Sequence, residues 1–209
     1  MIMVIQELKP SQRVKGRWLA VLEDGSILRI GENEVIGFGL YAGRELSECE
    51  GEDLRNAARQ SALKEKTIEL LSRRPQSRRE VERKLEQWEA GAEEAAAICD
   101  RMEELGFLND ADYAIRVVRH YSAKGYGERK LRDELYRRGV PRELWQQALE
   151  QVEDHSAALD SFLAKKLAGK AADRKELKKV SDALVRRGFS WSEVNEAMRR
   201  FGARVEDDL

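Results

Sequence analysis

One fifteen-residue pattern occurs twice in this sequence. Residues 135–149 read LYRRGVPRELWQQAL, and residues 184–198 read LVRRGFSWSEVNEAM. A more divergent copy begins near residue 85, so the copies follow one another at intervals of about fifty residues. Repeats at a fixed interval are typical of folds in which similar units each bury a small core and pack on their neighbours. We therefore expect a series of related units rather than one large core.

Apolar residues recur every three or four positions within each unit, as they do on the buried face of a helix. In the second helix of the units, these are Val81, Leu85 and Trp88, then Leu131 and Leu135, then Leu177, Val180 and Leu184. In the third helix they are Ala95, Ile98, Met102 and Leu105, then Leu144, Trp145, Ala148, Leu149 and Val152, then Val194, Ala197, Met198 and Phe201. The first helices contribute Ile68 and Leu71, then Tyr113, Val117, Val118 and Tyr121, then Leu159, Phe162, Leu163 and Leu167. The sequence predicts three units of three helices.

Helix ends are marked by residues that satisfy the free backbone groups there. The pairs with the spacing of a capping box are Ser77 with Glu80, Asp173 with Glu176, and Ser190 with Glu193. Pro141 suits the first position of a helix. Glycines at 106, 139 and 188 fall just past predicted helix ends, where a left-handed backbone is common.

The first fifty residues have a different pattern. Two apolar runs, 18–22 and 27–30, flank Asp24-Gly25, which suits a tight hairpin turn, and residues 3–8 are a candidate third strand. A short helix is expected next, capped at Asn33 and stopped by Gly37 or Gly39. We expect a mainly α fold with a small β element in residues 1–50, repeats in 51–108 and 109–154, and a third repeat with an acidic tail in 155–209.

Composition excludes several classes of protein. Charged residues make up 37% of the chain, yet 38 basic and 39 acidic residues nearly cancel. Any electrostatic function therefore depends on local segregation of charge. Two cysteines without CxxC spacing, no signal sequence and no long apolar run favour a cytoplasmic protein without a membrane span.

Basic residues gather in the first and second helices of each unit. Residues 64–86, 110–138 and 165–187 each carry an excess of Lys and Arg over Asp and Glu. Each arginine alone could be a solvated helix end, but recurrence in register favours a ridge that binds a long anionic partner. The candidate binding residues are Arg73, Arg74, Arg78, Arg79, Lys124, Tyr126, Arg129, Lys130, Arg132, Arg137, Arg138, Lys175, Lys178, Lys179, Arg186 and Arg187.

No catalytic, cofactor or metal site is predicted. His120 and His155 lack ligand-spaced partners, and no phosphate-loop motif occurs. The segment NDAD at 109–112 is better explained as a helix cap than as a cation site. Trp88 and Trp145 lie in core register, whereas Trp191 and the exposed candidates Tyr126 and Tyr136 could contact a partner.

Four segments resemble the RecX family of recombination regulators. They read LLSRRPQSRREVERKL at 70–85, LGFLNDADYA at 105–114, KGYGERKLRDELYRRGV at 124–140 and LVRRGFSWSEVNEAM at 184–198. The N-terminal hairpin and FGLYAGREL also fit, so the resemblance covers nearly the whole chain. In the first unit, Trp88-Glu89 stands where the later units have Arg-Gly.

The resemblance implies tandem three-helix repeats in an elongated, curved monomer. It also implies binding in the groove of the RecA–DNA filament, which modulates, and mostly inhibits, RecA's ATPase, strand exchange and co-protease activity in recombination, DNA repair and the SOS response. Weak, non-specific contacts with single- and double-stranded DNA are expected. A helical DNA-binding transcriptional regulator and a scaffold for an acidic protein remain the alternatives.

Overall fold

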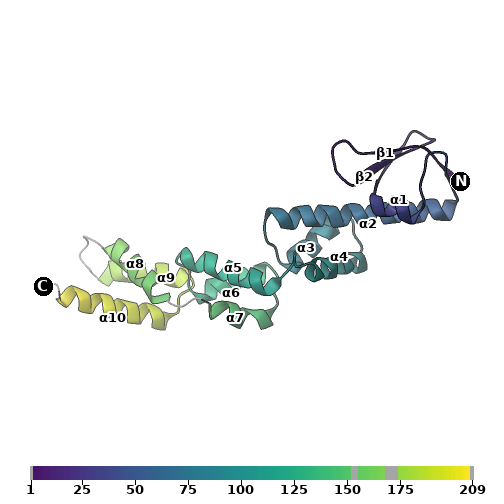
Figure 1. Ribbon diagram of the computed structural model, residues 1–209. Helices are drawn as coiled ribbons and strands as arrows, with labels where there is room; N and C mark the ends of the chain where they lie inside the picture. The colour runs from purple at the N-terminus through teal and green to yellow at the C-terminus, as the bar shows by residue number, and fades with distance from the viewer. Residues whose placement is uncertain (1, 152–154, 168–173, 208–209) are drawn as a thin grey trace. The chain divides into compact units, whose positions relative to one another are not determined.

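The computed structural model describes residues 2–151, 155–167 and 174–207. The protein is mainly α-helical with a small N-terminal sheet, as the sequence predicts (Figure 1). The chain forms two compact units, one made of residues 1–74 and 85–98 and the other of residues 75–84 and 99–209. None of the helices in the described ranges is long and apolar enough to cross a membrane.

The N-terminal sheet is antiparallel, with the strand order β3-β2-β1-β4. Its strands are β1 (Met3–Pro10), β2 (Arg17–Leu22), β3 (Ile27–Gly31) and β4 (Glu45–Leu46). The predicted hairpin is present: Gly25 has φ of 79°, and the Asp24 side chain accepts a hydrogen bond from the Ser26 N–H at 2.9 Å. β4 is too short to show an alternating pattern in the sequence, so it was not predicted.

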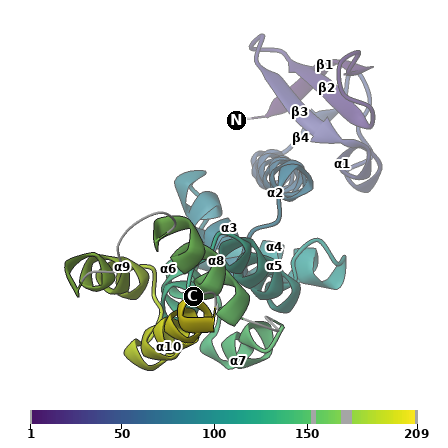
Figure 2. The ribbon, with the colours of Figure 1, turned by 90° about the vertical axis from the view of Figure 1, so that its left-hand side faces the viewer.

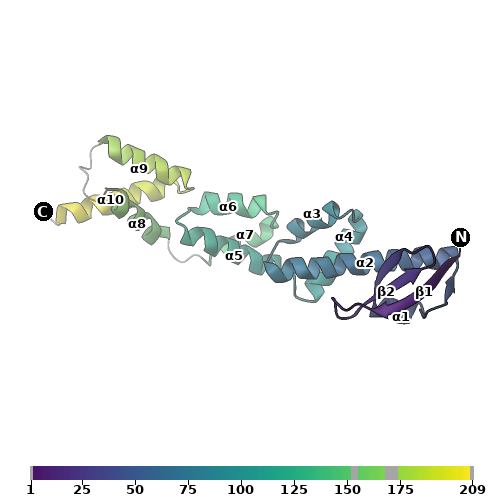
Figure 3. The same cartoon turned by 90° about the horizontal axis from the view of Figure 1, so that it is seen from above.

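Two helices follow, α1 (Glu32–Gly37) and α2 (Glu48–Arg73). The prediction that Asn33 caps α1 is wrong, because Gly31 occupies the cap and the Glu34 carboxylate accepts its N–H at 2.8 Å. Ser47 and Glu50 form a capping box at the start of α2. The sheet packs over one side of α2 (Figures 2 and 3), and Ile5, Leu46 and Leu54 are fully buried in their shared core.

The divergent first copy of the pattern lies at the end of α3 (Arg78–Gln87), in the following turn and at the start of α4 (Ala92–Glu104). Glu89 has φ of 65° there, the left-handed backbone that Gly139 and Gly188 adopt with φ of 69° and 95° in the later copies. Arg59 of α2 donates to the Glu89 carbonyl at 2.7 Å and to Glu94 at 2.9 Å. These contacts accompany a conformation that is otherwise unfavourable for a residue with a Cβ.

Two further three-helix groups make up most of the second unit. The first consists of α5 (Asp110–Ala123), α6 (Glu128–Arg137) and the short η1 (Arg142–Leu144) and α7 (Trp145–Leu149). The second consists of α8 (His155–Leu167), α9 (Arg174–Arg186) and α10 (Trp191–Asp207). Pro141 precedes the 3₁₀ turn η1 rather than opening an α-helix, which is a small departure from the expectation.

The predicted apolar stripes lie in the cores. Val81, Leu85, Leu131, Leu135 and Leu184 are fully buried. The other fully or almost fully buried members include Ile98, Met102, Val118, Leu163, Val194 and Ala197. Leu105 is the exception at 46% exposed, because α4 has already ended and the chain turns at Gly106. Val152 and Asp173 lie outside the described residues.

Neighbouring groups are joined through the ends of their second helices. The Gly127 N–H at the start of α6 donates to the Arg187 carbonyl at the end of α9 at 3.0 Å, and the Arg129 N–H donates to the Gly188 carbonyl at 3.1 Å. The first N–H groups and last C=O groups of helices lack partners within their own helix. Here the two sets satisfy each other, so α9 meets α6 end to end.

A similar end-to-end contact joins α6 to α3, but here a side chain makes the hydrogen bond. The Ser77 hydroxyl donates to the Arg138 carbonyl, so the start of α3 meets the end of α6. A Cβ at Gly139 would lie 2.6 Å from Cβ of Arg79, and a Cβ at Gly188 would lie 2.5 Å from the Lys130 nitrogen. Each copy of the Arg-Arg-Gly pattern thus lies at the end of a second helix, where that helix meets the start of the second helix of the preceding repeat. This shared position explains why the pattern recurs.

Candidate functional site

The exposed arginines of α3 and α6 meet at a pocket of about 470 Å³, here called the arginine pocket. It lies within the second compact unit, between the outer face of α3 and the turn that joins α6 to α7. Its lining residues are Arg79, Arg83, Tyr136, Arg137, Gly139, Val140, Pro141, Arg142 and Trp145. Four guanidinium groups and no carboxylate line it, so the pocket is suited to an anion.

Arg79 and Arg83 are one helical turn apart on α3, so their side chains share a face of the helix. The stem of Arg79 packs against Gly139, and its guanidinium lies 3.0 Å from Glu82. Arg83 is exposed and forms no ion pair within the described ranges. The close approach at Gly139 therefore fixes one arginine while the other extends freely.

The opposite wall comes from the turn after α6. The Trp145 indole N–H donates to the Val140 carbonyl at 2.9 Å, which holds the ring against the core of the second repeat. The Arg142 guanidinium lies over that ring, 5.8 Å from its centroid. Tyr136 is 68% exposed, although its ring is a large apolar surface. This wall therefore offers a positioned cation and an open aromatic face.

Glu134 is the buried anion beneath Arg137. It is 3% exposed, accepts a hydrogen bond from Arg137 at 2.6 Å and one from Arg138, and lies 3.2 Å from Lys130 Nζ. Burial alone would raise the pKa of this carboxyl, but the hydrogen bonds from Arg138, Lys130 and Arg137 outweigh it and lower the pKa to about 2. Glu134 thus stays ionised at neutral pH and holds three cations together.

A related pocket of about 570 Å³ lies where α6 meets the turn between α9 and α10, and we call it the second-junction pocket. Arg129 and Arg132 of α6 line it together with Trp191, which is 55% exposed. Glu128 and Glu193 line it as well, and Glu128 lies 2.6 Å from Arg132. At both junctions the end of one helix meets the start of another, but the two pockets differ in charge.

Three of the predicted binding residues are only partly exposed and are each held by two or more partners within the fold. Arg78 pairs with Glu82, Asp100 and Glu103 at 2.7–3.2 Å; burial alone would lower its pKa, but these bonds raise it above the usual value. Arg138 is 20% exposed and bonds Glu134 and the Tyr121 hydroxyl. Arg187 donates to the carbonyls of Lys124 and Gly125 and lies 4.8 Å from the Phe162 ring centroid.

The other predicted residues reach the surface on several elements. These are Arg73 and Arg74 at the end of α2, Lys124 after α5, Arg129, Lys130 and Arg132 on α6, and Lys175, Lys178, Lys179 and Arg186 on α9. Arg73 and Lys179 form local ion pairs with Glu69 and Glu176. Tyr126 packs partly against the core of the second repeat. Of the sixteen, the arginine pocket brings together Arg79 and Arg137.

Sequence reasoning missed Arg83 and Arg142 as pocket residues. Arg83 follows Arg79 at the i+4 spacing that places two side chains on one helix face. Arg142 follows Pro141 directly, and a proline at a helix start projects the next residues from a fixed turn. Both signals were present, but neither residue belongs to the repeated Arg-Arg-Gly pattern that guided the prediction.

Other polar groups serve the fold. Asn109 caps α5 by accepting the Asp112 N–H at 3.0 Å, in agreement with the helix-cap interpretation of NDAD. Burial raises the pKa of the Cys99 thiol to about 12, so this cysteine is not a reactive thiolate. No cluster of three or more potential metal ligands occurs among the residues described.

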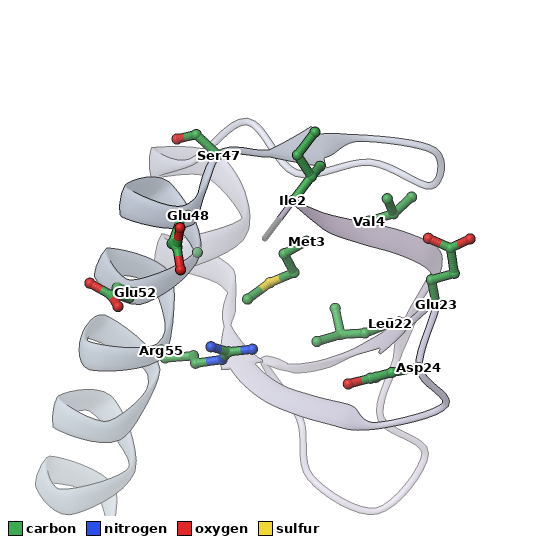
Figure 4. A pocket seen from close by; sticks show the side chains of 11 residues that line it. Ile2, Met3, Val4, Leu22, Glu23, Asp24, Ser47, Glu48, Glu52 and Arg55 are labelled. Carbon is green, nitrogen blue, oxygen red and sulfur yellow. The ribbon is translucent and has the colours of Figure 1, made fainter.

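The N-terminal module has a pocket of its own, of about 450 Å³ (Figure 4). Met3 lies between α2 and the strands at its centre, and Glu23, Asp24, Glu48 and Glu52 surround it together with one cation, Arg55. Four carboxylates against one guanidinium repel anions. This pocket is therefore electrostatically opposite to the arginine pocket.

Three family models match the helical part of the chain. They describe the first, second and third three-helix domains of RecX and match residues 64–102, 109–149 and 153–198, respectively. The matches follow the order of the repeats along the chain. The family models therefore account for the repeated pattern itself.

Curated proteins and solved structures agree with the family models. The chain is 33% identical to the Regulatory protein RecX of Pseudomonas entomophila (strain L48) over 139 residues, which cover 66% of this chain and 90% of that protein. It is 37% identical to the Regulatory protein RecX of Vibrio parahaemolyticus over 140 residues, or 65% of this chain and 88% of that protein.

A crystal structure of regulatory protein RecX has the same fold, with a TM-score of 0.74 at 22% identity over 94% of this chain and 99% of that one. RecX from Lactobacillus salivarius gives a TM-score of 0.61 at 21% identity over 70% and 99% of the two chains. Sequence relatives, repeat models and fold all point the same way. The chain belongs to the RecX family of regulatory proteins.

Proposed function

We propose that this chain is a non-enzymatic, monomeric regulator of the RecA recombinase that binds the RecA–DNA filament in its helical groove. In this role it lowers the ATPase, strand-exchange and co-protease activities of RecA. The relatives named Regulatory protein RecX support a regulatory role, and the arginine pocket is the observation that supports an anionic partner.

The repeats provide a physical reason for choosing an assembly as the partner. A filament offers the same surface many times, and the second compact unit carries two junctions at which the end of one helix meets the start of another. Weak contacts made by one body raise each other's effective concentration, so their combined affinity exceeds that of each contact. Contacts between guanidinium groups and phosphates or carboxylates also weaken with added salt.

The proposal is tested by DNA-dependent ATP hydrolysis by RecA. Substoichiometric amounts of the wild-type chain should lower the hydrolysis rate, and added salt should weaken this effect. An unchanged rate across the whole titration, together with tight binding to specific duplex sites, would instead favour a transcriptional regulator.

Charge reversal tests the surface. Arg79→Glu combined with Arg137→Glu should weaken inhibition at least tenfold, because each change places an acid beside the proposed anionic partner. Arg101→Glu combined with Arg116→Glu changes the net charge equally at exposed positions outside the pocket and should retain inhibition. Circular dichroism should show equal helix content in both double variants. Equal loss of inhibition in both would mean that only net charge matters.

A further inference from the structure

We propose that the arginine pocket binds one nucleotide of a single-stranded nucleic acid, with its backbone phosphate between the arginines and its base stacked on Tyr136. This assignment rests on the proposed function, because it names the ligand of the same surface. It goes beyond the proposed function in three respects: the nucleic acid is single-stranded, it binds at one defined pocket, and Tyr136 contacts its base.

The charge of the pocket favours a phosphate. Arg83 and Arg142 project from opposite walls, and neither forms an ion pair with a carboxylate in the parts of the chain that the structure describes. Guanidinium groups bind phosphate oxygens through two parallel N–H bonds, which a lysine cannot match. The two arginines are therefore available without breaking an internal ion pair.

Tyr136 favours an unpaired base. Its ring is 68% exposed at the rim of the pocket, and its hydroxyl forms no hydrogen bond with any described residue. Bases within a duplex are stacked on one another, whereas bases of a single strand can lie on an aromatic side chain. An open ring beside two available guanidinium groups thus matches a single strand better than a duplex.

Part of the pocket is formed in advance. Arg142 lies over the ring of Trp145, which is fixed by its hydrogen bond to the Val140 carbonyl. The stem of Arg79 is fixed against Gly139. Because these side chains are already ordered, binding loses less conformational entropy than it would on a flexible surface.

The second-junction pocket provides an internal comparison. It also lies where the end of one helix meets the start of another, but Val185 lines it where the arginine pocket has Tyr136. Trp191 follows Ser190 there, where Arg142 follows Pro141 in the arginine pocket. Arg132 is paired with Glu128, and Glu193 also lines the pocket. The structure thus assigns the nucleotide to the first junction and not to the second.

The test measures binding of a fluorescent oligothymidylate of about 12 nucleotides to the full chain, without RecA, at several salt concentrations. Each phosphate contact on a single strand contributes about 0.7 to the slope of log affinity against log salt. Because both arginines bind the same phosphate, Arg83→Ala with Arg142→Ala should therefore reduce the slope by about 0.7. The matched control, Arg101→Ala with Arg116→Ala at exposed positions that line neither pocket, should leave the slope within about 0.3 of the wild-type value.

Tyr136→Ala should weaken binding about fivefold or more with an unchanged slope, because stacking carries no charge. Tyr136→Phe should bind as the wild type does, since the ring is kept. A duplex of the same length should show no dependence on Tyr136.

Equal slopes for the two double variants, or full affinity in Tyr136→Ala, would overturn the assignment, as would absence of oligothymidylate binding by the wild type. Displacement of the oligonucleotide by polyglutamate at equal charge concentration would also overturn it, in favour of an acidic protein surface. The oligonucleotide measurements contain no RecA, so their outcome does not determine the outcome of the RecA ATPase assay. A wild-type chain that inhibits RecA while its pocket variants bind the oligonucleotide normally would refute the nucleotide site alone.

Discussion

Replacing Glu134 with glutamine should destabilise the second repeat strongly. The change keeps the shape of the side chain but removes the buried negative charge that faces Lys130, Arg137 and Arg138. The native pKa of Glu134 is about 2, compared with an ordinary value of 4.5. One pKa unit corresponds to about 1.4 kcal/mol, and two of the three cations reach solvent, so we expect a loss of about 2–3 kcal/mol in the free energy of unfolding at pH 7.

The effect should depend on pH in a defined direction. Because folding lowers the pKa of Glu134, the stabilisation is present above the unfolded value of 4.5 and is lost as the pH falls through the native value of about 2. The difference between the wild type and Glu134→Gln should therefore be nearly constant from pH 7 to about pH 5 and fall below half by about pH 3.

Urea unfolding followed by tryptophan fluorescence measures this difference. Trp145 reports on the second repeat if Trp18, Trp88 and Trp191 are first replaced by phenylalanine. Glu128→Gln is the matched control, since Glu128 lies on the same helix in an exposed pair with Arg132. It should cost about 0.5 kcal/mol or less. Equal losses for the two variants, or a difference that does not shrink in acid, would refute the role given to Glu134.

Two further changes test the contacts between neighbouring groups. Gly188→Ala should lower the free energy of unfolding in urea by at least about 2 kcal/mol, because its Cβ would lie 2.5 Å from the Lys130 backbone nitrogen. Gly106→Ala is the control, because Gly106 also has a positive φ but open space around it, and this change should cost about 1 kcal/mol. Equal costs would show that the close approach at Gly188 is unimportant. Tyr113→Phe removes the bond from the hydroxyl to Glu80 at 2.7 Å and should cost about 1.5–3 kcal/mol. Burial and this same bond raise the pKa of Tyr113. A cost no larger than that of Tyr136→Phe, at an exposed tyrosine, would contradict the bond.

Much of the fold follows from local patterns in the sequence. Leu131 and Leu135 recur at helical spacing and are fully buried, and Ser190 with Glu193 forms the capping box that its spacing predicts. Asp24-Gly25 forms the predicted turn. These features could be predicted because one helix face, one cap or one turn depends on residues only a few positions apart.

The candidate site could be predicted only in part. The sequence indicated that arginines recur, but not that Arg137 and Arg138 point in different ways. Arg137 has a side chain that is 66% exposed, whereas Arg138 is 20% exposed and bonds Glu134 and Tyr121. Adjacent residues on a helix face different directions, and the neighbouring α5 decides which of the two is covered.

The three-helix repeats, their capped ends and the N-terminal hairpin follow from the amino-acid sequence, because periodicity and turn chemistry are local. Helix packing, by contrast, places Arg83 and Arg142 on opposite walls of one pocket and makes Arg187 part of a junction instead of an open surface. Such a grouping depends on how the end of one helix meets the start of another. That meeting is set by hydrogen bonds from the first residues of one helix to the last carbonyls of the other, and by glycines that leave no room for a side chain. Neither is encoded in the spacing of charges along the chain.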